Sequence, residues 1–166
     1  FSPDGKNVVT AMQENALHGW RLRDKKDMAM SGYPAKVKSF VWVGDEPYLA
    51  TSGADEAIGW SFEGKDGPLG RNAETCAHGG NQQCTAVTGL LGVPGVFAGF
   101  FDGSVVAGKF NSDYTDLLIK RASGAPVSAM AVTPGGWLFV GDESGNVLWG
   151  NGVQGVARCA GGGDPS

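Results

Sequence analysis

The sequence is poor in cysteine, histidine and charge and has no long hydrophobic run, and each of these shortages excludes a class of protein. Three cysteines in 166 residues are too few for a disulfide framework, so reduced thiols and a cytoplasmic location are expected. No stretch approaches the about 20 apolar residues of a membrane-spanning helix. A formal charge of −4 and a pI of about 5.1 leave no broad basic surface, so neither a membrane nor nucleic acid is expected as a partner.

Glycine, by contrast, is abundant, and its distribution favours a chain with many turns. There are 28 glycines, about one residue in six against a usual share of about 7%. They follow no Gly-x-y period, and no long segment shows the 3.6-residue period of an amphipathic helix. Because 42% of the residues are hydrophobic, the chain has enough apolar side chains for a core. The composition therefore indicates short strands joined by tight turns.

One order of features recurs four times: an apolar strand, a Gly/Pro turn, a second strand, an Asp/Asn/Gly turn and a third strand around Trp. Trp20, Trp60, Ala107 and Trp149 stand at the corresponding place of each unit, 40, 47 and 42 residues apart. Such a period, with several strands in each unit, is typical of propeller blades. The expected strands cover residues 8–11, 17–20 and 28–31; 39–42, 48–51, 58–60 and 74–77; 86–89, 96–99, 105–107 and 117–120; 129–132, 137–140 and 147–149.

The amino-acid sequence of these repeats resembles that of the WD-repeat β-propeller family over about residues 1–150. The motif Phe1-Ser2-Pro3-Asp4-Gly5-Lys6, followed by Glu14-Asn15 and Trp20-Arg21-Leu22, is close to the family's repeat, and residues 49–60 are nearly as close. Residues 61–68 are similar to a group of bacterial WD-repeat proteins. The resemblance implies an all-β fold with about four four-stranded antiparallel blades, forming an open arc of a larger ring of about seven blades.

The expected organisation is a partial propeller over residues 1–159, with blades at about 1–37, 38–85, 86–127 and 128–159, and a flexible tail at 160–166. The chain starts inside a turn motif without an initiator Met, so we expect a C-terminal part of a longer protein, with about three further blades upstream. An open arc exposes both of its flanks. Val8, Leu17, Phe139 and Leu148 are the candidates for that exposed surface.

Two family features are missing. No Trp is followed by Asp, and the Gly-His pair before the first strand does not occur. Of the hydrogen-bonded tetrad that the resemblance implies, Asp55, Thr51 or Ser52, and Trp60 supply three members, while no histidine takes the fourth place. We therefore expect packing, more than a polar network, to hold the blades. The recurring tryptophans are expected in the core.

A search for catalytic or ligand-binding motifs finds two weak candidates. Residues 103–109 match the first seven positions of a phosphate-binding loop, but Phe110 replaces the required hydroxyl and a strand is expected in place of the helix. Cys76, His78 and Cys84 offer zinc-type ligands at a spacing that matches no common site. With two histidines in the chain, no nucleophile–histidine triad can be assembled. No catalytic residue, bound metal or cofactor is therefore expected.

Acidic residues recur in the turns between the second and third strands. Equivalent turns of a propeller lie on one face, so these residues are expected to form an acidic interaction face: Glu14, Asp55, Glu56, Asp102, Asp142 and Glu143. The alternative is that Asp and Glu occur there because they suit turns. The expected function is a non-catalytic scaffold that binds a protein partner through its face loops. Two alternatives stay open: a propeller enzyme or cofactor binder with a central-channel site, and an accessory factor in metal handling.

Overall fold

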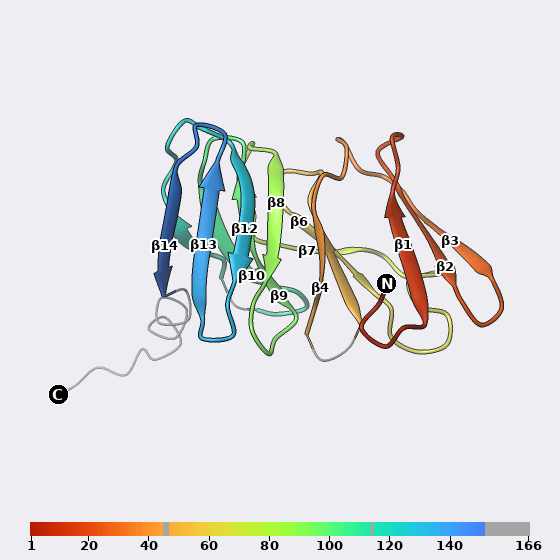
Figure 1. Ribbon diagram of the computed structural model, residues 1–166. Coiled ribbons are helices and arrows are strands. Elements are labelled where there is room, and N and C mark those ends of the chain that lie inside the picture. Colours follow the sequence, from red (N-terminus) through yellow and green to blue (C-terminus); the bar gives the residue numbers. More distant parts are fainter. Residues whose placement is uncertain (45–46, 114, 152–166) are drawn as a thin grey trace.

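The computed structural model describes residues 1–44, 47–113 and 115–151, and the regular elements in these ranges are all β-strands (Figure 1). The described residues contain no helix that is long and apolar enough to span a membrane. In the described residues, fourteen strands form four antiparallel sheets, each built from strands that follow one another in the sequence. All fourteen expected strands are present, so the all-β, blade-forming expectation is confirmed.

Each sheet is one blade. Blade 1 has three strands, β1 (Asn7–Ala11), β2 (Leu17–Arg21) and β3 (Lys26–Met30). Blade 2 has four, β4 (Phe40–Val43), β5 (Tyr48–Thr51), β6 (Ala57–Ser61) and β7 (Glu74–Cys76). Blade 3 has four, β8 (Cys84–Gly89), β9 (Gly95–Phe100), β10 (Val105–Lys109) and β11 (Leu117–Lys120). Blade 4 has three in the described range, β12 (Val127–Val132), β13 (Trp137–Asp142) and β14 (Val147–Asn151).

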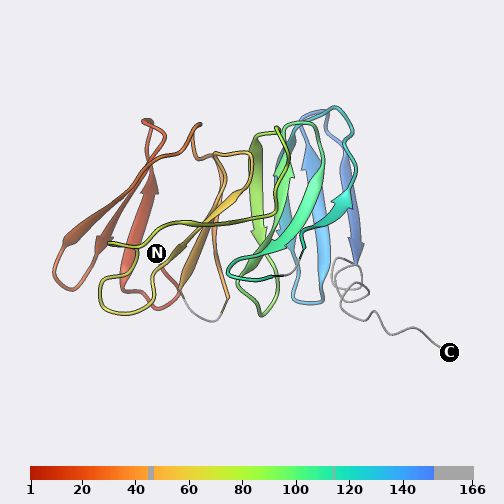
Figure 2. The same cartoon turned by 180° about the vertical axis from the view of Figure 1, so that it is seen from behind.

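The blades stand side by side as an arc, with blade 1 at one end and blade 4 at the other (Figures 1 and 2). Three clusters of buried apolar side chains lie between consecutive blades. Leu17 of blade 1 and Leu49 of blade 2 belong to the first cluster, Ala57 and Phe100 to the second. The core is thus a series of blade-to-blade interfaces, and each internal blade is buried on both faces.

The first strands of blades 3 and 4 begin earlier than the sequence pattern indicated, because both contain a β-bulge. Register shifts occur between Cys84 and Ala86 and between Val127 and Ala129. The bulged Thr85 donates its hydroxyl to the carbonyl of Val127 at 2.6 Å, which joins the two blades. β8 therefore starts inside the range expected for blade 2. Residues 152–159, expected in the last blade, and the expected tail at 160–166 lie outside the described residues.

The turn expected at Asp102-Gly103 joins β9 to β10. Gly103 has a φ of +86°, and a Cβ there would lie 2.6 Å from the carbonyl oxygen of Ala125, so only glycine suits the position. The segment that follows is a strand, as expected, with Phe110 buried behind it. A phosphate-binding loop needs a helix there, so the structure excludes that interpretation of residues 103–109.

The four repeat positions lie on equivalent strands, but their side chains are not all on the same face: Trp20, Trp60, Ala107 and Trp149. Backbone bonds from Phe62 to Pro47 and from Phe110 to Pro94 mark the same place in blades 2 and 3, so Trp60 corresponds to Gly108 and not to Ala107. Side chains of a strand alternate between faces, and a shift of one residue reverses the direction. A Cβ at Gly108 would meet the backbone nitrogen of Ala77 at 2.4 Å, which leaves no space for an indole.

Trp60 therefore faces blade 1 and Trp20 points to the same side of its own blade, away from blade 2, whereas Ala107 faces blade 4 and Trp149 points away from blade 3. Trp60 packs against the cluster between blades 1 and 2, and Ala107 lies in the cluster between blades 3 and 4. Trp149 is 66% exposed. The expectation that Trp149 packs in the core is wrong within the described chain, because blade 4 has no following blade there.

Candidate interaction surfaces

The six predicted carboxylates lie on or directly beside the β1–β2, β5–β6, β9–β10 and β13–β14 turns, and these turns lie along the upper edge of the arc in Figure 1. We call this edge the turn edge. Its acidity is partly offset, because Lys36 bonds the side chain of Gln13 there and Lys120 donates to the carbonyl of Gly103 at 2.6 Å. The structure thus brings the predicted residues to one edge, together with cations that the sequence argument did not include.

Two of the six carboxylates hold their own turns. Asp102 accepts hydrogen bonds from the backbone and hydroxyl of Ser104, at 2.8 and 2.6 Å. Asp142 accepts from Asn146 and from the backbone of Ser144, and the Asn146 side chain contributes most to lowering the pKa of Asp142. These two side chains act as the turn preference of Asp predicts.

Glu56 belongs to a charged cluster that joins blade 2 to blade 3. His78 contacts Asp116 through Nδ1 at 2.5 Å and Glu56 through Nε2 at 2.8 Å. Asp116 also accepts the backbone N–H groups of Ala77 and His78, at 3.0 and 2.8 Å. The hydrogen bond with Asp116 is the main cause that raises the pKa of His78, while the bonds from His78 and Ala77 outweigh burial and lower the pKa of Asp116. Glu14, Asp55 and Glu143 remain exposed on the turn edge.

The thiols near His78 do not form a metal site with it. Cys76 and Cys84 are free and buried, and burial raises the pKa of both thiols, that of Cys84 to about 12. Both ring nitrogens of His78 are directed at carboxylates instead. Among the described residues no group of three or more His, Cys, Asp and Glu side chains could hold a metal ion.

A buried polar chain, which the sequence argument missed, crosses from the blade 1–2 connection into blade 2. Trp60 donates its indole N–H to the Tyr33 hydroxyl at 2.6 Å, and that hydroxyl lies 2.8 Å from the hydroxyl of Thr51. Thr51 in turn donates to the carbonyl of Ile58 at 3.1 Å. Thr51 and Trp60 thus belong to one hydrogen-bonded network, as the tetrad implied, but Tyr33 links them, and Asp55, the third expected member, is exposed on a turn outside this network. Packing alone does not hold this blade.

The face of blade 4 that points away from blade 3 carries large exposed apolar side chains. Its members are 37–66% exposed: Trp137, Phe139, Val147 and Trp149. We call this surface the outer face of blade 4. Phe139 pairs with Trp149 as buried Phe97 pairs with Ala107 in blade 3, so the same positions are covered one blade earlier. Phe139 lies on this uncovered flank, as expected, whereas Leu148 is exposed but pairs with Val140 and lies on the face of blade 4 that is directed at blade 3.

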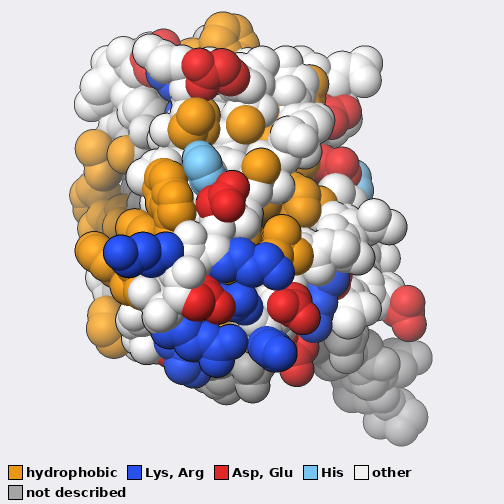
Figure 3. Space-filling view, turned by 90° about the vertical axis from the view of Figure 1, so that its right-hand side faces the viewer, with side chains coloured by type: hydrophobic (Ala, Val, Ile, Leu, Met, Phe, Trp, Pro, Cys, Tyr) orange, Lys and Arg blue, Asp and Glu red, His pale blue; other side chains and the backbone are white. Residues whose placement is uncertain are grey.

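The opposite end of the arc is more polar. Figure 3 shows hydrophobic side chains over the middle of this face of blade 1 and a gathering of Lys and Arg at its lower end. Trp20 stacks on His18 with ring centroids 4.3 Å apart, and Val8 pairs with Trp20 across β1 and β2. Leu17, expected on this flank, is only 1% exposed because it faces blade 2. Trp42 packs inside, edge-on against Phe62.

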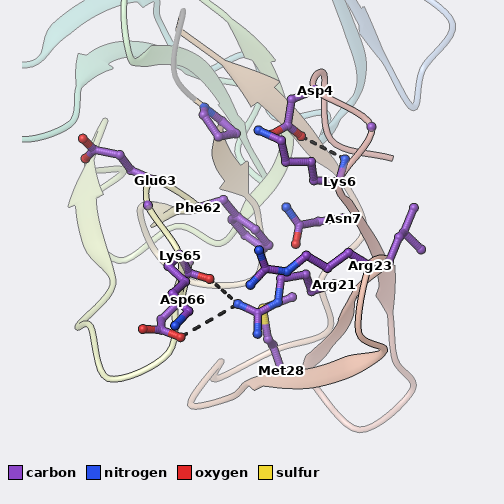
Figure 4. Close-up of a pocket in the computed structure, with 15 residues that line it drawn as sticks. Asp4, Lys6, Asn7, Arg21, Arg23, Met28, Phe62, Glu63, Lys65 and Asp66 are labelled. Carbon is purple, nitrogen blue, oxygen red and sulfur yellow. Dashed lines mark hydrogen bonds and ion pairs between the residues drawn. The ribbon is translucent and has the colours of Figure 1, made fainter.

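A cavity of about 810 Å³ lies between blades 1 and 2, at the edge opposite the turn edge (Figure 4). We call it the basic groove, because Lys6, Arg21, Arg23 and Lys65 line it. Composition indicated no basic surface, and these cations come from three separate segments of the sequence. Folding brings them together because the segments before β1, after β2 and after β6 end at the same edge.

Comparison with solved structures gives the class of fold. A chain in the crystal structure of the mitotic checkpoint complex matches with a TM-score of 0.70 at 17% sequence identity, over 90% of this chain and 46% of that one. The computationally designed Ika4 protein matches with a TM-score of 0.62 at 14% identity, over 88% of this chain and 85% of that one. No known sequence family and no curated protein matches the chain.

These matches and the four packed antiparallel sheets show a β-propeller architecture. Within that class, the described blades have a WD-repeat-like fold. The chain spans about half the length of the checkpoint-complex chain that it matches. At these identities the likeness shows the fold alone.

Proposed function

We propose that this chain is part of a non-catalytic protein-binding scaffold of the WD-repeat type. The turn edge, where exposed carboxylates stand on short hydrogen-bonded turns, carries this proposal, and the outer face of blade 4 indicates a second surface that packs against protein. Contiguous exposed apolar side chains mark protein-binding surfaces, and Trp is enriched among residues that dominate binding energy. Here two tryptophans, a phenylalanine and a valine share one sheet face.

The proposed occupant of that face is a further propeller blade of a longer protein. Phe139 and Trp149 hold the positions at which Phe97 and Ala107 of blade 3 are buried against blade 4. A blade packed on the outer face would cover them in the same manner. We further propose that such blades complete a ring of about seven with this chain.

The proposed surface for a separate protein partner is the turn edge. Glu14, Asp55 and Glu143 are exposed there, and the turns of Asp102 and Asp142 are fixed by internal hydrogen bonds. A rigid scaffold that carries polar groups on short turns suits recognition of another protein, because little order is lost on binding. We propose a cytoplasmic location, which the free, buried thiols of Cys76 and Cys84 support.

Capture from an extract of the source cells, with three immobilised baits, tests this function. The baits are the unchanged chain, a turn-edge variant with Glu14→Lys, Asp55→Lys and Glu143→Lys, and a control with Trp149→Lys on the outer face of blade 4. We expect at least one protein to be retained saturably by the unchanged chain and the control, and to be lost from the turn-edge variant. Retention of the same proteins with equal affinity on all baits would refute recognition through the turn edge, and no saturable retention would refute the scaffold function.

A further inference from the structure

The basic groove has a shape that its own residues maintain. It is bounded by the chain before β1, the end of β2 and the loop after β6. Arg21 fixes this loop to blade 1, because it donates to the carbonyl of Lys65 and lies 3.8 Å from Asp66. Asp24 holds the same guanidinium through two bonds, at 2.9 and 2.8 Å, and this contact lowers the pKa of Asp24 to about 2. With 14% of its side chain exposed, Arg21 serves to position the groove.

Other cations at the groove are exposed and weakly paired. Arg23 is 65% exposed, and its contact with Asp24 is 3.7 Å long, to a carboxylate that Arg21 already holds. Lys6 is 76% exposed and contacts Asp4, and Lys65 is exposed. Figure 4 shows the guanidinium groups of Arg21 and Arg23 directed into the cavity, with Lys6 at one end. These side chains can reach an anion without breaking a strong internal pair.

The local charge is opposite to that of the whole chain. In the described part of the chain, five cations and four carboxylates stand around the groove and on the adjoining β2–β3 turn: Lys6, Arg21, Arg23, Lys25 and Lys65, with Asp4, Asp24, Glu63 and Asp66. The chain as a whole carries a net charge of −4. Figure 3 shows the Lys and Arg side chains gathered at this end of blade 1. An anionic ligand is therefore attracted to the groove and repelled by most of the remaining surface.

The walls favour a peptide over a bare anion. The apolar surface that a ligand can reach is at the mouth, where Leu22 is 44% exposed and Pro47 is half-buried, while Phe62 and Met28 behind it are each only 3% exposed. Asn7, whose amide points into the cavity in Figure 4, can hydrogen-bond a peptide group. Asp4, Glu63 and Asp66 alternate with the cations along the lining, which disfavours an unbroken polyphosphate.

We propose that the basic groove binds an acidic segment of a partner protein, one in which Asp or Glu alternates with apolar residues. This rests on the proposed scaffold function and adds a second binding edge to it, opposite in position and charge to the turn edge. Cations at the rim accelerate association and select a partner of negative charge, while Leu22 and Pro47 at the mouth offer apolar surface to its hydrophobic side chains.

The test is fluorescence anisotropy with the full chain and a labelled peptide of about twelve residues in which Glu and Asp alternate with Leu and Phe. We expect saturable binding that weakens as NaCl rises. The variant Arg23→Glu with Lys65→Glu should bind about tenfold more weakly, since two exposed cations become repulsive. The control Arg121→Glu reverses an exposed cation on the blade 3–4 connection and should change affinity less than about twofold.

Three outcomes would refute the proposal that the basic groove binds an acidic segment. The first is that the unchanged chain does not bind the acidic peptide, and the second is that the double variant binds it with equal affinity. The third is that the chain binds more tightly either the same peptide with Lys at each acidic position or a single-stranded DNA of matching length. Urea midpoints check folding, and Arg23→Gln with Lys65→Gln replaces the double variant if it unfolds. The proposed function is tested independently of the groove. If the peptide binds but no protein is retained saturably from the extract, the scaffold function is refuted. If a partner is retained but the peptide does not bind, only the proposed role of the basic groove is refuted.

Discussion

Removal of the Tyr33 hydroxyl is expected to destabilise the protein more than a chemically identical change elsewhere in the same core. Tyr33 is 6% exposed, and its hydroxyl accepts from the Trp60 indole at 2.6 Å and lies 2.8 Å from Thr51 Oγ1. Because Thr51 donates its own proton to the carbonyl of Ile58, Tyr33 must donate to Thr51. The variant Tyr33→Phe interrupts this chain in the middle.

The size of the effect follows from the groups that lose a partner. In Tyr33→Phe the indole N–H of Trp60 has no acceptor and the buried Thr51 hydroxyl has no donor. A buried polar group left without a partner costs about 1–3 kcal/mol. Trp60 is half-buried, so water recovers part of its loss. We expect a loss of about 1.5–3 kcal/mol in the free energy of unfolding.

Tyr48→Phe is the matched control. Tyr48 is 9% exposed, and its hydroxyl, like Oε2 of the neighbouring Glu74, is buried without a hydrogen bond of good geometry among the described residues; burial is the main cause that raises the pKa of Tyr48. Its removal is expected to change the free energy of unfolding by less than about 0.5 kcal/mol, or to stabilise the chain.

Urea unfolding followed by tryptophan fluorescence measures both variants. The reasoning is refuted if Tyr33→Phe costs less than about 0.5 kcal/mol, or no more than Tyr48→Phe.

Three further predictions concern other parts of the arc. The pKa of His78 is raised, so its stabilising charge is present below about pH 6.5 and is lost as the pH rises through the folded-state pKa. The urea midpoint should therefore fall across that pH window. His78→Gln should remove this part of the pH dependence. Gly108→Ala should lower the free energy of unfolding by about 1–3 kcal/mol, because the new Cβ would lie 2.4 Å from the backbone nitrogen of Ala77. Gly150 is at the equivalent place of blade 4 and has open space, so Gly150→Ala should cost less than about 0.5 kcal/mol. Equal urea midpoints for the two variants would contradict this. Trp149→Lys should reduce concentration-dependent association in light scattering, and unchanged association would show that the outer face of blade 4 is not its cause.

The strands could be predicted because their signals are local. Apolar runs such as Tyr48–Thr51 and Leu117–Lys120 are bounded by glycine, proline and acidic turn residues, and the unit repeats four times. The Asp102-Gly103 turn needs no tertiary information either, since few residues other than glycine adopt its positive φ. Register was harder. Ala107 was aligned with Trp60 because it lies in the equivalent strand, but only the backbone bonds of Phe62 and Phe110 show the shift of one residue.

For the candidate surfaces too, some features could be predicted from the sequence and others only from the structure. The turn-edge carboxylates could be placed from the repeat, since equivalent turns share an edge. Their hydrogen bonds could not be predicted, so Asp102 and Asp142 were not distinguished from exposed Glu14. The sequence analysis missed the basic groove: residues 21–26 hold four cations, but only folding brings Lys6 and Lys65 beside them.

By itself the sequence determined the strands, the turns and the repeated blade, because backbone conformation and alternating burial depend on neighbours within a few residues. The tertiary structure decided which face each side chain occupies and which distant residues meet. Tyr33 joins Thr51 and Trp60 only once blade 1 packs on blade 2, and His78 meets Asp116 only once blade 2 packs on blade 3. These contacts depend on the angle and register between sheets, which arise from the packing of whole faces and not from any short segment.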